Sequence, residues 1–325
     1  MLKAENLGKV YHTSVGKGFF KREKVTVEAV KNLNLEIREG QIVGLLGING
    51  AGKTTTIKML STLLAPTVGN ISIDGMDAVK NATEVKKFIN MVAGGERMIY
   101  WRLTGRENLW YYGQLYGVEE KVLKKRMEYL LELVGLTEKQ DVPVERYSKG
   151  MKQRLQIARG LINDPRYIFM DEPTLGLDAA ISKELREYVK QIAYKEGKSI
   201  LLTSHYMQEV EELCEYIYIL DHGTVIAQGT PKELAHLARE HKILCLELQS
   251  ITNELHGDLN RICLSVEKNC SIQLDEKNKA YTITSTKDLS TEIAKVLLQH
   301  EVPIKKFYTQ EPRLEDTIIK LSKGA

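Results

Sequence analysis

The fold of this chain is decided by residues 47–55, Gly47-Ile48-Asn49-Gly50-Ala51-Gly52-Lys53-Thr54-Thr55. The stretch follows an apolar run at residues 41–46 and precedes a helical pattern at residues 56–60, so it joins a strand to a helix. In that context glycines let successive backbone N–H groups turn toward one point, and the helix N-terminus adds partial positive charge. The sequence therefore predicts a phosphate-binding loop and, with it, a nucleotide-binding protein.

Individual roles follow from the side chains of this loop. Lys53 would reach the β- and γ-phosphates of the nucleotide, and the Thr54 hydroxyl would complete the shell of a Mg²⁺ ion. A chance match on a glycine turn is the alternative, and the strand before the loop argues against it. The expected nucleotide contacts are Gly47, Asn49, Gly50, Ala51, Gly52, Lys53, Thr54 and Thr55.

Composition excludes several classes of protein. The chain has 325 residues, enough for two or three domains, and its net charge of +3 argues against a basic nucleic-acid binder. No run reaches the roughly 18 apolar residues of a membrane helix, and residues 1–6 lack the core of a signal peptide. The four cysteines show no Cys-x-x-Cys spacing. We expect a soluble, cytoplasmic chain without a nucleic-acid partner.

Hydrophobic patterning divides the chain into parts of different character. Residues 1 to about 40 have strand-like patterns, and the loop leads into an α/β core with buried strands at 167–170 and 199–203. Helical spacing covers about 105–135 and 180–195, and a polar helical stretch ends near residue 88. We predict an α/β nucleotide-binding domain at 1–234, with an antiparallel β subdomain and a helical subdomain at about 96–160, and a small α+β domain at 235–325.

Two carboxylates follow the buried strand at 167–170. Asp171 emerges at the carboxyl end of that strand, where it would hold Mg²⁺. Glu172 is placed to take a proton from an attacking water molecule. A buried strand that ends in an acidic turn is the plain alternative. With the phosphate-binding loop alone, kinases, GTPases and motor ATPases all remain open.

A second motif narrows this choice. Ser148 can cap a helix whose apolar face repeats at helical spacing, and Gly150 leaves the N-terminus of that helix open to an anion. Residues 147–154, Tyr147-Ser148-Lys149-Gly150-Met151-Lys152-Gln153-Arg154, resemble the signature of the ATP-binding-cassette (ABC) family, usually Leu-Ser-Gly-Gly-Gln. They depart from it at Tyr147, Lys149 and Met151.

Further motifs carry the same resemblance in the family's order. Residues 171–174 follow at the family's distance, residues 175–178 resemble the D-loop, and His205 matches the switch histidine. The resemblance implies ATP and Mg²⁺ as cofactors and a homodimer or heterodimer of ABC subunits, in which Ser148 and Gly150 serve the ATP of the partner. The resemblance also implies that His205 contacts the γ-phosphate and that Asp178 belongs to the D-loop. It implies further that the Tyr11 ring stacks on the adenine. Ordinary packing of Tyr11 is a competing interpretation.

One departure concerns the glutamine that the family usually has before its helical subdomain. When residues 102–109 are aligned with the start of the family's helical subdomain, the glutamine position falls on Gly95. Glycine has no side chain that could take the role of the glutamine. We hypothesise that Glu96 takes its place beside Mg²⁺ and the attacking water. Tyr100 and Trp101 would then lie near the groove that receives a membrane partner, although packing within the subdomain explains them equally well.

The tail points to a subgroup of the family. Glu311-Pro312-x-Leu314-Glu315-Asp316 resembles the ending of cassettes from drug-resistance and sodium-extrusion exporters. The expected function is therefore the ATPase subunit of an ABC exporter, with a separately encoded membrane permease, on the inner face of the cell membrane. A cassette ATPase that acts on ribosomes or DNA is the alternative, and the single cassette without a long coiled coil speaks against it.

Overall fold

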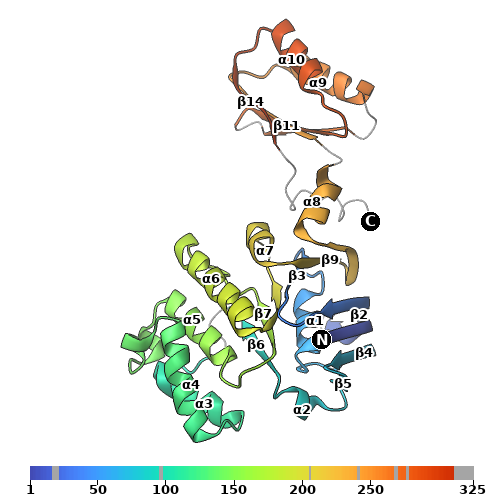
Figure 1. The fold of residues 1–325 in the computed structure, drawn as a ribbon. Coiled ribbons are helices and arrows are strands. Elements are labelled where there is room, and N and C mark those ends of the chain that lie inside the picture. Colours follow the sequence, from blue (N-terminus) through green and yellow to red (C-terminus); the bar gives the residue numbers. More distant parts are fainter. Residues whose placement is uncertain are drawn as a thin grey trace. The chain divides into compact units, whose positions relative to one another are not determined.

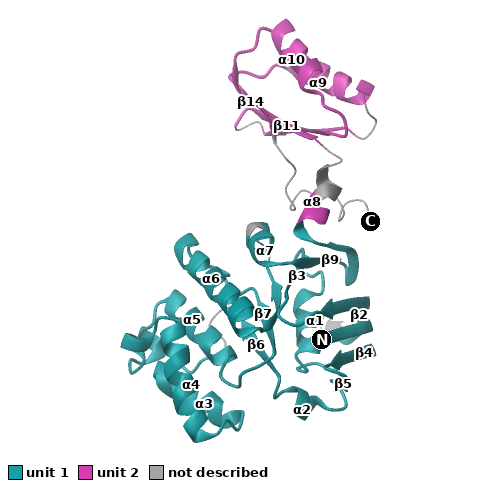
Figure 2. Cartoon of the chain, in the orientation of Figure 1, with its two compact units in different colours: residues 1–231 teal, residues 232–325 magenta. Residues whose placement is uncertain are grey.

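A computed structural model gives the fold, and it describes residues 1–16, 22–94, 98–204, 206–239, 242–266, 270–275 and 278–310. The chain forms two compact units, Met1–Pro231 and Lys232–Ala325 (Figure 2). Each is described by itself. Figure 1 gives the labels of the helices and strands.

An antiparallel sheet forms the front of unit 1. Its strand order is β2-β1-β4-β5, and its members are β1 (Leu2–Gly16), β2 (Arg22–Ile37), β4 (Val68–Ile73) and β5 (Met76–Asp77). The pairing of β1 with β2 runs from Leu2 opposite Ile37 to Gly16 opposite Arg22. Alternating apolar residues on these strands, among them Leu33 and Leu35, are buried in the core that this sheet shares with the central sheet.

The central sheet of unit 1 positions the predicted site. Its order is β10-β9-β3-β8-β7-β6, with parallel pairing from β9 to β6 and an antiparallel edge strand β10. The strands are β3 (Ile42–Gly47), β6 (Ile89–Ala93), β7 (Tyr167–Asp171), β8 (Ser199–Thr203), β9 (Tyr216–Asp221) and β10 (Thr224–Gly229). Continuous burial of β3 and β8 is typical of parallel strands covered on both faces. Because these strands are parallel, their carboxyl ends meet at one edge.

Helices connect the strands of the central sheet. They are α1 (Lys53–Leu60), α2 (Ala82–Val85), α6 (Ala179–Glu196) and α7 (Met207–Leu213). A polar helical stretch was expected up to about residue 88, and the helix that forms there is the short α2. The Asp77 carboxylate accepts hydrogen bonds from the backbone N–H groups of Val79 (2.9 Å) and Lys80 (3.0 Å). Such a local side-chain turn competes with a helix.

Between β6 and β7 the chain builds a helical layer. Its helices are α3 (Gly105–Leu115), α4 (Glu120–Leu133) and α5 (Lys149–Gly160), with the short turns η1 (Thr137–Lys139) and η2 (Val144–Arg146). A capping box starts α3: the Thr104 hydroxyl accepts from Glu107 N (3.1 Å), and the Glu107 carboxylate accepts from Thr104 N (2.8 Å).

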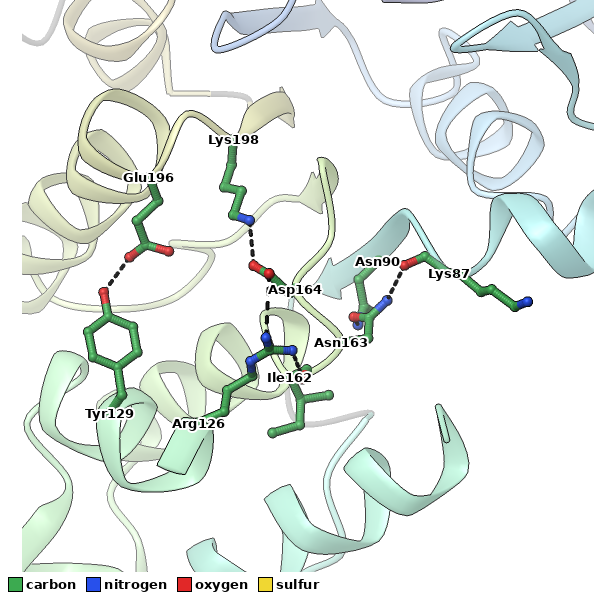
Figure 3. A network of polar contacts seen from close by, with 9 residues as sticks. All are labelled: Lys87, Asn90, Arg126, Tyr129, Ile162, Asn163, Asp164, Glu196 and Lys198. Carbon is green, nitrogen blue, oxygen red and sulfur yellow. Dashed lines mark hydrogen bonds and ion pairs between the residues drawn. The ribbon is translucent and has the colours of Figure 1, made fainter. Parts of the chain in front are cut away.

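Polar contacts fix this layer to the rest of unit 1 (Figure 3). The Arg126 guanidinium on α4 donates to the carbonyl oxygen of Ile162 (3.2 Å), and it lies 3.4 Å from the Asp164 carboxylate, which also pairs with Lys198 at 2.5 Å. The Tyr129 hydroxyl donates to Glu196 (2.6 Å), and that bond to a carboxylate raises the pKa of Tyr129 to about 12. Helix α4 is therefore tied both to the loop after α5 and to the end of α6.

Unit 2 has a split βαβ topology. Its elements are α8 (Pro231–Arg239), β11 (Lys242–Leu248), α9 (Asn253–Val266), β12 (Ser271–Asp275), β13 (Ala280–Ser285), α10 (Ser290–Gln299) and β14 (Ile304–Gln310). The antiparallel sheet has the order β12-β13-β11-β14, which is the ferredoxin-like arrangement. Leu244, Leu246 and Tyr281 of the sheet pack with Leu259 of α9 and Ile293 of α10 in a separate core. Among the described residues, no helix combines the length and the apolar character needed to span a bilayer.

Candidate nucleotide-binding site

The predicted phosphate-binding loop joins β3 to α1 in a conformation that requires glycine. Gly52 has a φ of +104°, and a Cβ atom there would lie 2.5 Å from the carbonyl oxygen of Ala29. A Cβ atom on Gly47 would lie 2.4 Å from the carbonyl oxygen of Leu220. Side chains at these positions would push neighbouring backbone away, so the loop keeps its shape only with glycine.

Lys53 is the cation of this loop. It begins α1 and is only 6% exposed, and its Nζ atom donates to the carbonyl oxygens of Gly47 (2.6 Å) and Ile48 (3.2 Å). Burial lowers the pKa of Lys53, while the charges of Glu172 and Asp171 act in the opposite direction. A buried ammonium beside two carboxylates is well placed to attract an anionic group.

Asp171 ends β7 next to this loop. Its Oδ1 atom accepts a hydrogen bond from the Thr203 hydroxyl at 2.6 Å and lies 3.5 Å from the Thr54 hydroxyl. The parallel register pairs Asp171 with Thr203 on β8. Thr54 of α1 and Asp171 of β7, which lie 117 residues apart in the sequence, thus meet at the carboxyl edge of the sheet.

Glu172 has an uncommon backbone conformation. Its φ is +51°, a left-handed value that costs free energy for any residue with a side chain. The backbone N–H of Glu172 lies 3.1 Å from both the hydroxyl and the carbonyl oxygen of Thr203, which hold it in place. Such strain is typical of functional positions. We missed Thr203 in the sequence, although its place at the end of the buried strand 199–203 was the available signal.

We call Lys53, Thr54, Asp171 and Glu172 the phosphate-loop site. They meet at the carboxyl ends of parallel strands, where α/β sheets bind their ligands. Together they offer an ammonium for phosphate and hydroxyl and carboxylate oxygens of the kind that Mg²⁺ prefers. A second carboxylate lies one residue beyond the predicted metal ligand. The arrangement can therefore bind a nucleoside triphosphate and polarise a water molecule against it.

The signature residues lie at the start of α5. Ser148 caps this helix, and its Oγ atom accepts from Met151 N at 3.2 Å. Gly150 is buried, and a Cβ atom there would lie 2.6 Å from the Ile181 side chain. Among the described contacts, no hydrogen bond or ion pair joins Ser148 or Gly150 to residues 47–55.

The segment after Glu172 is bound to the signature in the same chain. The Lys149 ammonium donates to the carbonyl oxygen of Gly176 at 2.8 Å. Asp178 caps α6, with its carboxylate accepting from Ile181 N at 3.0 Å. The Tyr147 hydroxyl donates to the Lys139 carbonyl (2.6 Å), and its ring is buried, so this signature position belongs to the core.

The other predicted residues are Tyr11 and several that lie outside the described part of the chain. Tyr11 lies on β1 and is 37% exposed, with the Lys9 ammonium 5.6 Å from its ring centre. His205 and the Gly95–Glu96 position lie outside the described residues, as do the Glu311–Asp316 motif and the rest of the tail.

The buried carboxylate of Glu209 was not foreseen from the sequence. Glu209 of α7 is 2% exposed and accepts hydrogen bonds from the hydroxyls of Ser204 (2.5 Å) and Thr174 (3.1 Å). Ser204 directly precedes His205, and Thr174 follows Glu172 by two residues. Glu209 thus joins the end of β8 to the segment after β7.

Comparisons with known proteins agree with this geometry. The family model described as "ABC transporter" matches residues 30–175. The ABC transporter ATP-binding protein NatA of Bacillus subtilis (strain 168) is 42% identical over 224 residues, which cover 69% of this chain and 91% of that relative. The linearmycin resistance ATP-binding protein LnrL of the same organism is 35% identical over 322 residues, covering 99% and 98%.

The fold is also found among solved structures. A dimeric ATP-binding cassette in a post-hydrolysis state, bound to ADP and Pi, matches with a TM-score of 0.62 and 26% identity, over 71% of this chain and 98% of that one. The predicted fold class is therefore confirmed: an α/β phosphate-loop nucleotide hydrolase with an antiparallel sheet and a helical insertion. The chain belongs to the ABC transporter family, and it is an ATP-binding subunit that hydrolyses ATP.

Proposed function

We propose that this chain is the ATPase subunit of an ABC exporter, works as a dimer and drives a separately encoded membrane permease. One observation carries the dimer: the phosphate-loop site is assembled in one chain, while Ser148 and Gly150 have no described hydrogen bond to residues 47–55. A second copy, or a related subunit, would supply its own Ser148 and Gly150 over the bound ATP. The dimeric cassette among the similar structures supports this arrangement.

The side chains of the phosphate-loop site have distinct proposed tasks. Lys53 binds the β- and γ-phosphates, with the backbone N–H groups of the loop around it. Thr54 and Asp171 would hold Mg²⁺, which supplies charge neutralisation at the phosphates; two protein oxygens suit an ion that keeps water and phosphate ligands. Glu172 takes a proton from the attacking water, and His205 contacts the γ-phosphate. Tyr11 stacks on the adenine, and Asp178 lies in the D-loop facing the partner subunit.

We further propose that residues 1–234 form the nucleotide-binding domain and that residues 235–325 form an accessory domain. The NatA match of 224 residues is close to the length of unit 1, whereas the LnrL match spans nearly all of this chain. We also propose export as the direction of transport and the inner face of the membrane as the place of the chain; the name of LnrL, a resistance protein, supports the direction alone.

Purification of the tagged chain from detergent-solubilised membranes of its own host tests the proposal. We expect a polytopic membrane protein to be recovered with it in a stoichiometric amount, identified by mass spectrometry. Recovery of ribosomal proteins or DNA, without a membrane protein, would refute the proposed pairing with a permease. It would favour a cassette ATPase that acts on ribosomes or DNA.

A surface for that permease is offered by exposed aromatic residues. Tyr100, Trp101, Trp110 and Tyr111 expose 47%, 48%, 46% and 38% of their surface, and we call them the aromatic face. Exposed aromatic clusters mark protein interfaces, and such anchors contribute about 2 kcal/mol each.

We predict that Trp101→Ala lowers recovery of the permease roughly 30-fold, the equivalent of about 2 kcal/mol. Tyr194→Ala, at a tyrosine of α6 that is 58% exposed, is the matched control. If the two variants recover equal amounts of the permease, Trp101 does not contribute to the interface. Quantitative immunoblotting of the co-purified permease measures the result.

Glu96 is proposed to act beside Mg²⁺ in place of the usual glutamine. Support comes from Gly94, two residues earlier in the sequence, whose N–H donates to the Asp171 carbonyl oxygen at 2.6 Å and so places Gly94 next to the phosphate-loop site. We predict that Glu96→Ala raises the Mg²⁺ concentration needed for half-maximal ATPase rate roughly tenfold. Titration of the rate with Mg²⁺ tests this, and an unchanged curve and rate would show that Glu96 has no such role.

A further inference from the structure

Arg159 near the end of α5 is a buried cation that has no carboxylate partner among the residues that the structure describes. It is 1% exposed, and its guanidinium donates to Asn90 Oδ1 (3.0 Å), the Met91 carbonyl oxygen (2.9 Å) and Met98 Sδ (2.7 Å). No ion pair to Arg159 is found among the described residues, and its Nε atom has no hydrogen-bond partner there. A charge is costly to bury, and an apolar side chain of similar volume would fill this place at lower cost. Its directional contacts therefore need an explanation other than packing.

On one side these contacts reach the phosphate-loop site. Asn90 and Met91 belong to β6, which pairs in parallel with β7 so that Ala93 lies opposite Asp171. One residue further, Gly94 N donates to the Asp171 carbonyl oxygen at 2.6 Å. A shift of β6 along its axis would therefore move the backbone at Asp171.

On the other side Arg159 reaches the surface through three tyrosine rings. Its guanidinium carbon lies 5.0 Å from the centre of the Tyr112 ring, at cation–π distance. The Tyr112 ring packs edge-on against Tyr111 (5.4 Å, 85°) and lies 6.1 Å from Tyr100. Tyr100 and Tyr111 belong to the exposed aromatic face and contact each other at 4.9 Å.

We propose that Arg159 is a positioning residue that links the phosphate-loop site to the aromatic face. Its guanidinium is planar, so it can hold the carbonyl oxygen of β6 in its plane and the Tyr112 ring against its surface. Coupling between distant sites travels through such contiguous contacts when they have alternative arrangements. This link rests on the proposed roles of Asp171 and Glu172. Through it, binding of the nucleotide at the phosphate-loop site would change the surroundings of the aromatic face.

The chain contains its own reporter for this link. Its two tryptophans, Trp101 and Trp110, both belong to the aromatic face. Binding of MgATP is therefore expected to change intrinsic tryptophan emission. Arg159→Met should abolish that change and lower kcat about tenfold, while the Kd for MgATP from calorimetry stays within about threefold and Tm does not fall.

Matched variants separate positioning from packing. Arg126→Met on α4 removes a guanidinium that also donates to a carbonyl oxygen (Figure 3). No cation–π contact of Arg126 is found among the described residues, so this variant should keep the emission change. Arg159→Lys keeps the charge without the planar group and should restore kcat only in part. Tyr112→Leu should lose the emission change and Tyr112→Phe should keep it, which tests the link even if Arg159→Met does not fold.

The results for these variants distinguish a positioning role of Arg159 from a packing role. A parent-like emission change and kcat in Arg159→Met and Tyr112→Leu would overturn the link, as would bound MgATP without any emission change in the parent chain. A loss of kcat that only follows a loss of Tm would assign Arg159 to packing. No binding of MgATP by the parent chain in calorimetry would refute the proposed site itself, and the link with it.

Discussion

Glu172→Gln is expected to abolish ATP turnover while MgATP binding remains. Glutamine has the shape of glutamate but cannot take a proton from water, so kcat should fall by about 10²- to 10⁴-fold, the usual contribution of a general base. The backbone of Glu172 is held by Thr203, with N–O distances of 3.1 Å, and its φ of +51° is independent of the side-chain charge. The variant should therefore keep the backbone geometry of the site and lose only the transfer of a proton from water.

A steady-state phosphate-release assay measures this effect, with calorimetry of MgATP binding beside it. Glu184→Gln is the matched control, since Glu184 is an exposed glutamate on α6. If the dimer is closed by ATP and reopened by hydrolysis, the Glu172→Gln variant should also be dimeric with MgATP in light scattering. Turnover within threefold of the parent chain would exclude Glu172 as the base.

The phosphate-loop site could be predicted from sequence because its parts follow strands. Each strand that ends in a functional residue is a short, mostly apolar run, and parallel strands bring their carboxyl ends to one edge of a sheet. Asp171 and Glu172 were found this way. Thr203 was missed because its role depends on register: β8 pairs with β7 so that Thr203 lies opposite Asp171, and no local pattern contains that information.

Other parts of the fold depend on pairing between distant segments. Strand-like and helical patterns in residues 243–299 indicate a small α+β unit, but not that β13 lies between β12 and β11. The split βαβ arrangement of unit 2 therefore became evident only in the structure. Arg159 was missed for a similar reason, because arginine on a helix usually faces water and its burial depends on β6 and α3.

Lys53→Met is the second change with a large expected effect, here on nucleotide affinity. The Lys53 ammonium is buried and donates to the carbonyl oxygens of Gly47 and Ile48, so its hydrogen bonds are already oriented within the loop. Truncating one partner of a buried charged contact costs about 3 kcal/mol, which is roughly a 150-fold rise in Kd for MgATP. Methionine fills a similar volume, so the loop should stay folded.

The neighbouring carboxylates make this loss larger than that of one hydrogen bond. The charges of Glu172 and Asp171 act on Lys53, and without its ammonium an approaching triphosphate meets two negative groups near the loop. Lys58→Met is the matched control, since Lys58 is an exposed lysine one turn further along α1. Calorimetric titration of both variants with MgATP compares them directly. If Lys53→Met binds within threefold of Lys58→Met, the backbone N–H groups and Mg²⁺ hold the phosphates without Lys53, and the buried ammonium serves only to close the loop.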